Sequence, residues 1–131
     1  MVIGKIQGTL GDAAPPALTP ETGAAGLLLA ASGEDARTEV GRQAVAGALM
    51  KLLHVPRPKA AALRAQAEAL MAEGAGAERL AGAAASLPAD DRDRLVGQLW
   101  GLADDAGTLA LAAVRDAFGL TEERLAALRP R

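Results

Sequence analysis

The sequence contains no cysteine and almost no aromatic residues. The lack of cysteine excludes disulfide frameworks, thiolate metal sites and cysteine nucleophiles from these 131 residues, and it is typical of a reducing compartment. One Trp, one Phe and no Tyr are present, so a hydrophobic core has to be built from Ala, Leu and Val. Base stacking, on which single-stranded nucleic-acid binding depends, has almost no residues to carry it.

The chain also lacks a large excess of positive or negative charge, and it has no long hydrophobic run. The chain has 14 basic and 16 acidic residues, a net charge of −2, so no basic excess can neutralise a phosphate backbone and we expect no nucleic-acid partner. The longest apolar stretch, residues 23–31, is about half of the ~20 residues that a membrane-spanning helix requires. Residues 1–9 lack the basic-then-apolar pattern of a signal peptide. We therefore expect a cytoplasmic protein with at most peripheral membrane association, through a partner.

The residues that are abundant favour helices. Half of the chain is apolar, and much of that half is Ala, the strongest helix former, together with Leu. β-branched residues are scarce, and no long window alternates between apolar and polar residues as a half-buried strand would. A length of 131 residues predicts one domain. We therefore predict an all-α protein.

Start and stop signals divide the chain into an arm and seven short helices. Residues 1–18 are rich in Gly and contain Pro15-Pro16, so they are predicted to be an arm or loop, and residues 19–131 a single helical domain. Threonine N-caps and proline or glycine stops bound the helices. The predicted helices cover residues 20–32, residues 35 or 38 to 55, residues 58–73, residues 77–86, a segment that starts near Asp90, one capped by Thr108 and one capped by Thr121.

The sequence also repeats itself faintly. The stretch 27–35 and the stretch 99–107 are each the end of a helix followed by an acidic, glycine-containing turn, and each leads into a second helix that a breaker stops. We call these two turns the first and second elbow. The simplest assembly is a compact bundle in which two helix-turn-helix hairpins share one core. Both elbows are then expected at the same end of the molecule.

Two helices and their turns resemble a known family. The stretch 60–70 looks like the middle helix of bacterial TerB-like domains, and Asp93 to Trp100 looks like their helix before the second acidic turn. Gly33 and Glu39 match the Gly and Glu of the family's first turn. TerB-like domains are small helical domains named for tellurite-resistance operons and related to part of certain membrane-bound J-domain co-chaperones. The resemblance covers about residues 24–129.

The resemblance implies an acidic site where the two elbows approach each other. Family members are thought to bind a divalent cation there and to act in stress-response assemblies near membranes. In this chain, Ser32 stands where the family has Asp, and in the second elbow Asp104 matches while Asp105 replaces Gly. No Glu follows on the next helix, so two ligands of the family's set are missing. A degenerate cation site is therefore expected.

Five acidic residues are the candidate metal ligands: Glu34, Asp35, Glu39, Asp104 and Asp105. Their carboxylates could converge as an oxygen-rich site for Ca²⁺ or Mg²⁺. The alternative is that they stabilise helix N-termini and solvate the turns, because carboxylates favour the positive end of a helix dipole. The dense ligand spacing of a Ca²⁺-binding loop is absent, which favours the second interpretation.

Catalysis has no visible residue set. His54, the only histidine, is placed in the last helical turn before Pro56, where an imidazole favours the negative dipole end, and zinc would need further N or S ligands. Trp100 is either an exposed interface anchor or a core residue whose N–H reaches a carbonyl. No phosphate-binding glycine loop is present. We therefore predict no catalytic residues and no bound cofactor.

The function predicted from the sequence is a non-enzymatic helical interaction or scaffold module of TerB-like type, acting in a stress response of the tellurite-resistance kind. Its partner would be another protein or a second copy of the chain. The alternative is a functional metal-binding stress protein that uses the acidic elbows.

Overall fold

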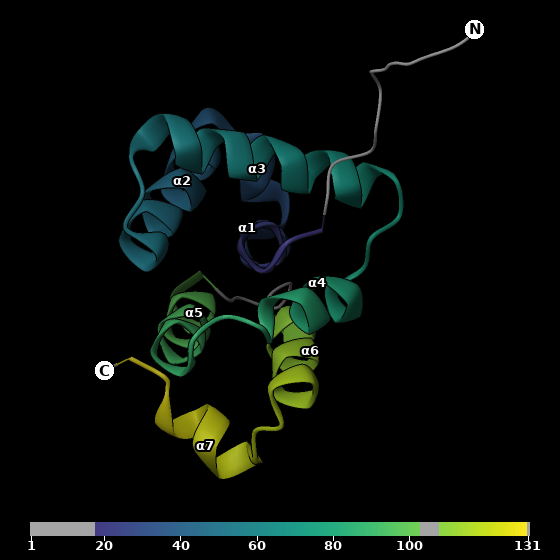
Figure 1. Cartoon of the computed structure of the whole chain (residues 1–131), viewed down its shortest axis with the longest axis vertical. Coiled ribbons are helices and arrows are strands. Elements are labelled where there is room, and N and C mark those ends of the chain that lie inside the picture. The colour runs from purple at the N-terminus through teal and green to yellow at the C-terminus, as the bar shows by residue number, and fades with distance from the viewer. Residues whose placement is uncertain (1–17, 103–107, 131) are drawn as a thin grey trace, which may run out of the picture.

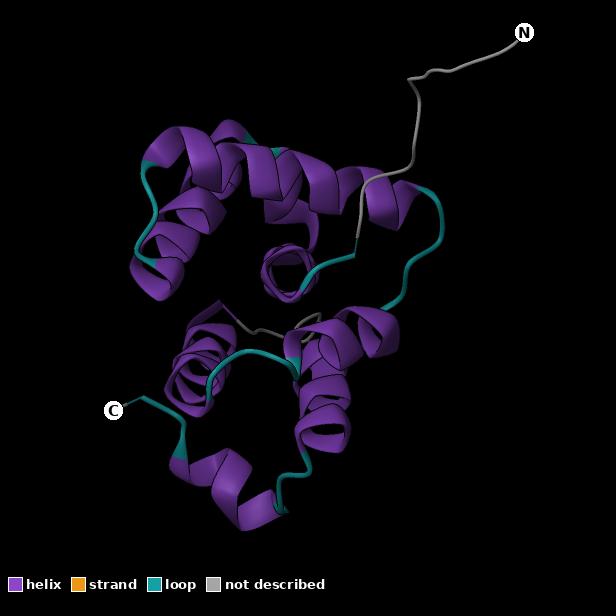
Figure 2. Ribbon diagram, in the orientation of Figure 1, coloured by secondary structure: helices purple, strands orange, loops and turns teal. Residues whose placement is uncertain are grey.

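Seven α-helices make up most of residues 18–102 and 108–130, the part of the chain that the computed structural model describes (Figure 1). No strand is present in that part (Figure 2), so the predicted all-α bundle of short helices is confirmed. Nearly all of the predicted arm, together with Asp104 and Asp105, lies outside the described residues. The elements are α1 (Pro20–Ser32), a 3-10 turn η1 (Gly33–Arg37), α2 (Glu39–Leu53), α3 (Arg57–Ala72), α4 (Ala77–Ala84), α5 (Ala89–Leu102), α6 (Thr108–Phe118) and α7 (Glu122–Ala127).

Threonine side chains begin three of these helices. The hydroxyl oxygens of Thr19, Thr38 and Thr121 each accept a hydrogen bond from the backbone N–H three residues ahead, at 3.1, 2.9 and 3.0 Å. Each bond satisfies one of the donors that a helix start leaves without an intrahelical partner. Thr38, rather than Asp35, is therefore the cap of α2.

The predicted end of the second helix at residue 55 is wrong. α2 ends at Leu53, because His54 takes a left-handed conformation with φ 56° and ψ 46°. His54 is exposed and lies one residue beyond α2, rather than inside its last turn. The left-handed residue turns the chain toward Pro56 and α3, a role that glycine more often fills.

The centre of the molecule is α1, which Figure 1 shows end-on between the other helices. It contacts α2 and α3 on one side and α4, α5 and α6 on the other. Ala24, Ala25, Leu27 and Leu28 are all 0% exposed. A helix that is covered on every side needs no polar face, and the uninterrupted apolar stretch of α1 has none.

The tightest helix contact joins α1 to α4 and depends on glycine. A Cβ atom on Gly23 would lie 2.5 Å from the carbonyl oxygen of Leu80, and one on Gly26 would lie 2.6 Å from Cδ2 of the same leucine. At Gly23 the clash would be with backbone atoms, so that position requires glycine, whereas at Gly26 it would be with the flexible end of the Leu80 side chain, which would have to move aside. The predicted hairpin partners do contact each other, α1 with α2 and α5 with α6, but the most extensive interface of α1 is with α4.

The last helix, α7, is attached by polar contacts. Nε1 of Trp100 donates a 2.9 Å hydrogen bond to the carbonyl oxygen of Leu125, as predicted for a core tryptophan, but the side chain is only partly buried and packs against the core rather than within it. The guanidinium of Arg129 stacks 5.3 Å from the Trp100 ring, and Arg124 pairs with Asp93 of α5 at 2.9 Å. Within the described residues, no helix has both the length and the apolar character needed to cross a membrane.

Candidate functional site

The first elbow begins where α1 gives way to η1. The hydroxyl of Ser32 donates a 2.9 Å hydrogen bond to the carbonyl oxygen of Leu28, one turn back along α1. Gly33 has φ 58° and ψ −132°, so it has the positive φ that a left-handed turn requires but a ψ far from it. Gly33 therefore ends α1 as a glycine stop, but not in the full left-handed conformation in which glycine commonly closes a helix. The chain continues into η1 through a conformation that glycine adopts readily.

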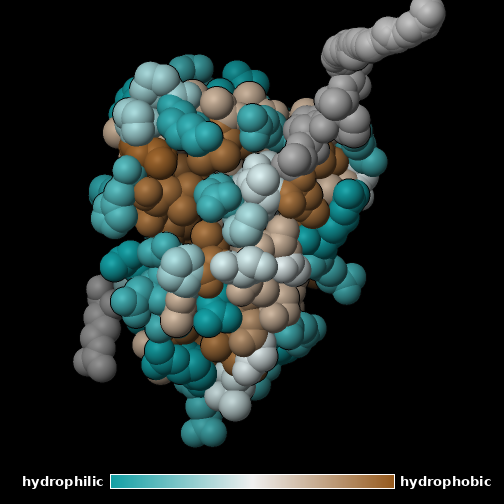
Figure 3. All heavy atoms as spheres, viewed as in Figure 1, coloured by the Kyte–Doolittle hydropathy of each residue, from teal (hydrophilic) through white to brown (hydrophobic). Residues whose placement is uncertain are grey.

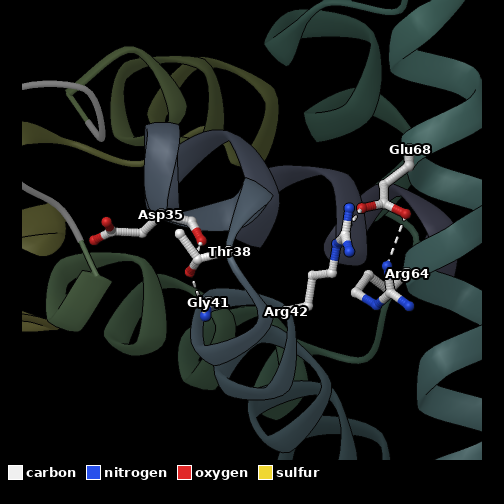
Figure 4. Close-up of polar contacts among 6 residues, drawn as sticks. All are labelled: Asp35, Thr38, Gly41, Arg42, Arg64 and Glu68. Carbon is white, nitrogen blue, oxygen red and sulfur yellow. Dashed lines mark hydrogen bonds and ion pairs between the residues drawn. The ribbon is translucent and has the colours of Figure 1, made fainter.

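A compact hydrogen-bonded link fixes the other end of the elbow (Figure 4). The Thr38 hydroxyl donates to the carbonyl oxygen of Asp35 at 2.7 Å and accepts from the backbone N–H of Gly41 at 2.9 Å. A Cβ atom on Gly41 would lie 1.7 Å from that same Asp35 oxygen. Gly41 is therefore essential for the elbow, and the sequence analysis missed it. The available signal was a glycine in the first turn of a helix, where it lowers helix stability unless packing requires it.

The predicted acidic ligands of the first elbow do not converge. Glu34, Asp35 and Glu39 are all exposed, and Oε1 of Glu39 accepts a 3.1 Å hydrogen bond from the Gln43 side chain. In Figure 4 the Asp35 carboxylate points away from the link that its own backbone makes with Thr38. Within residues 18–102 and 108–130, no three His, Cys, Asp or Glu side chains lie close enough together to hold a metal ion.

A hollow of about 460 Å³ nevertheless lies at this elbow. One of its walls is Leu102, the last residue of α5 and the residue from which the second elbow begins. The start of the second elbow therefore lies beside the first, as the repeat predicts. We call this region the elbow surface and define it by the residues that line the hollow: Ser32, Asp35, Thr38, Val40, Gly41, Ala44 and Leu102.

Exposed apolar side chains mark the helices that follow the elbows. Among the described residues, Val40 is 80% exposed and Leu109 is 77% exposed, whereas the core leucines of α1 are at most 4% exposed. Val40 is the second residue of α2 and Leu109 is the second residue of α6. Each is therefore the second residue of the second helix of its hairpin. Val40 stands on the rim of the elbow surface itself.

Neighbouring helices hold the elbow surface in place. Arg42 of α2 and Arg64 of α3 both pair with the Glu68 carboxylate, at 3.8 and 2.7 Å (Figure 4). Nε2 of Gln98 on α5 donates a 3.0 Å hydrogen bond to the carbonyl oxygen of Ala48 on α2. The ion pairs are partly exposed, so each contributes no more than about 1 kcal/mol. Together these contacts fix α2, and therefore Val40, relative to α3 and α5.

One arginine far from the elbow has a shifted pKa. Arg115 on α6 donates to Asp116 at 3.1 Å and to Glu122 at the start of α7. These hydrogen bonds raise the pKa of the Arg115 guanidinium above its ordinary value. The Arg115 guanidinium is charged at every pH of interest, with or without this shift. The raised pKa therefore reflects a structural contact between α6 and α7, and Arg115 supplies no proton for catalysis.

Comparisons with known proteins add nothing to this description. No family model matches the chain, and no match was found among the curated proteins or the solved structures. The resemblance to TerB-like domains therefore stays a prediction that depends on the residues quoted for it.

Proposed function

We propose that this chain is a non-enzymatic interaction module and that the elbow surface is where its partner binds. The observation that carries the proposal is Val40, an apolar side chain that is 80% exposed on the rim of a hollow. Ala44 and Leu102 line the same hollow, so Val40 is part of a small apolar surface rather than an isolated side chain, and such surfaces are found at protein contact sites. Apart from Leu102, the remaining wall residues are small or polar, which leaves room for a partner's side chain.

The supporting contacts make Val40 a suitable anchor. The link from Thr38 to Asp35 and Gly41 holds the first turn of α2. A valine side chain has a single strongly preferred rotamer in a helix, so little conformational entropy is lost when a partner covers it. The partner is a protein or a second copy of the chain, and a role in a stress-response assembly follows from the TerB-like resemblance. In this proposal Glu34 and Glu39 solvate the elbow and stabilise helix starts rather than bind metal.

Replacement of Val40 by Asp tests the proposal. An acidic residue in the first turn of α2 interacts favourably with the helix dipole, so Val40→Asp is expected to leave the fold intact while it removes the apolar anchor. Ala62→Asp adds the same charge at an exposed position in the middle of α3 and is the matched control.

The measurement has two parts. Light scattering on the purified chain over a range of concentrations detects self-association, and affinity purification from the source cells followed by rebinding of the purified partner detects another protein. Association that the parent chain and Ala62→Asp share, and that Val40→Asp loses at least tenfold, supports the proposal. Equal association of all three chains contradicts it.

A metal-binding stress protein is the second candidate. The elbow surface brings Asp35 beside Leu102, two residues before Asp104 in the sequence, which favours a shared site. Saturation with Ca²⁺ or Mg²⁺ at about 100 times Kd would stabilise the fold by ~2.7 kcal/mol. Thermal unfolding with and without each ion, compared with the Glu39→Ala/Asp104→Ala double variant, decides the question. A shift that the double variant abolishes favours metal binding, and the absence of any shift contradicts it.

A further inference from the structure

A second hollow, of about 520 Å³, lies at the opposite end of α1 from the elbow surface. Its apolar wall consists of Leu53, Val55, Leu63 and Leu87, which come from α2, α3 and the segments that follow α2 and α4. Figure 3 shows hydrophobic side chains gathered on this face, where α2 and α3 meet. We call this hollow the amino-end groove, because Thr19, directly before α1, also lines it.

Residues 2–10 carry an apolar pattern that suits such a groove. Val2, Ile6 and Leu10 are spaced by four residues. Side chains four apart share one face of a helix, and an even spacing also puts them on one face of an extended strand. The three side chains therefore form one apolar face in either backbone conformation. Lys5 is the only charged residue among residues 2–10.

The position of this segment in the chain favours the amino-end groove over the hollow at the elbow surface. Eight residues lie between Leu10 and Thr19, so these two residues are at most about 30 Å apart when the chain is fully extended. The groove starts at Thr19 itself, whereas the elbow surface lies a further 13-residue helix away, about 20 Å. A short tether gives an effective concentration in the millimolar range, so even a weak intrinsic affinity leads to occupancy.

The charges on the rim of the groove also match. Glu21 and Asp91 line the groove with one basic residue, Lys59, so acidic groups are in excess there. A basic group at Lys5 complements that excess.

We propose that residues 2–10 of this chain dock into the amino-end groove, with Val2, Ile6 and Leu10 against its apolar wall. The groove is then an internal docking site. The elbow surface at the other end of α1 stays free for an external partner, so this inference stands independently of the proposed function.

Disulfide trapping in the full chain tests the docking. Because the sequence has no cysteine, no native thiol competes with the two introduced ones. Thr9→Cys is combined with Gln66→Cys, an exposed residue that lines the groove, or with Gln43→Cys, an exposed glutamine near the elbow. The three apolar residues of the segment, Val2, Ile6 and Leu10, are unchanged in both variants.

Under mild oxidation, the Gln66 pair is expected to close within one chain on the order of tenfold faster than the Gln43 pair, because docking raises the local concentration of the two thiols. Equal rates overturn the proposal. A disulfide that joins two chains also overturns it, since the groove would then take its segment from a second copy.

Hydrogen exchange on single-residue variants gives a second readout. Ile6→Asp puts a charge on the apolar face of the segment, whereas Gln7→Asp puts the same charge on the neighbouring residue, outside that face. Ile6→Asp is expected to speed amide exchange severalfold at Val55 and Leu87 and to leave Gly41 at the elbow unchanged. Gln7→Asp is expected to match the parent chain at all three amides. Identical exchange in the two variants overturns the proposal.

Discussion

α1 and α7 belong to one bundle but are held in it by different forces. Nine of the 13 residues of α1 are buried, so its attachment is apolar on every side. α7 buries only Leu125 and is attached by the Trp100 hydrogen bond and by ion pairs from Arg124 and Arg115. Apolar burial is large and insensitive to salt, whereas exposed ion pairs are weak and screened by it. We therefore expect α7 to detach well before the centre of the bundle unfolds.

The largest effect is expected at the centre. Leu28 is 0% exposed, and Leu28→Ala removes its contacts and leaves a cavity, so the free energy of unfolding should fall by about 2–5 kcal/mol. Leu109→Ala, at a residue that is 77% exposed, should change it by less than about 0.5 kcal/mol. Urea unfolding followed by circular dichroism measures both. Similar losses in the two variants would contradict the central role of α1.

Two glycines of α2 should respond to alanine with opposite signs. Gly41→Ala forces a Cβ against the Asp35 carbonyl and is expected to lower the free energy of unfolding by about 1–3 kcal/mol. Gly47 has nothing within 4 Å of the added atom, so Gly47→Ala should raise it by about 0.5–1 kcal/mol, because alanine favours helix. Thermal unfolding distinguishes the two signs. Stabilisation by both variants would mean that the elbow is not held as described.

Removal of the indole N–H should loosen α7 alone. Trp100→Phe retains an aromatic ring but leaves the Leu125 carbonyl without its donor, which is expected to lower stability by about 1 kcal/mol. Amide exchange should become faster in α7 and stay unchanged at Leu28 and Leu49. Equal acceleration in α1 would show that the two regions unfold together and would remove the contrast between them.

The smallest effect is expected at the exposed ion pair that joins α7 to α5. Asp93→Asn removes the partner of Arg124 and should change global stability by about 0.2–1 kcal/mol. The difference from the parent chain should shrink as salt is raised, because screening already weakens the pair. Stability measured at low and at high salt checks this expectation. A loss that does not depend on salt would point to packing rather than charge.

Local features of the fold could be predicted from the sequence because their causes lie within a few residues of each other. Thr19, Thr38 and Thr121 cap helices through bonds to backbone groups three residues ahead. The sequence identifies Thr19 and Thr121, and it offers Thr38 with Asp35 as the alternative. The contact of Trp100 with a carbonyl follows from the chemistry of a packed indole. The identity of that carbonyl, 25 residues away, does not.

The features that the sequence analysis missed depend on contacts made after the chain has folded. Gly41 is required only because the Asp35 carbonyl turns back against it, and Gly23 only because α4 crosses α1 there. The left-handed turn at His54 is not expected of a non-glycine residue. For the candidate site, the sequence identifies the elbow and its exposed acids. The exposure of the Val40 side chain becomes apparent only once the structure shows which residues are buried.

The central position of α1 also has a consequence for synthesis on the ribosome. The helices that cover it do not come from one neighbouring segment, since α2 and α3 follow directly but α4 ends roughly fifty residues after Ser32. At about 5–20 residues per second, translation needs ~3–10 s to produce that stretch. During this interval the most apolar segment of the chain has only part of its cover, so newly made chains depend on rapid closure of α2 and α3 or on a chaperone.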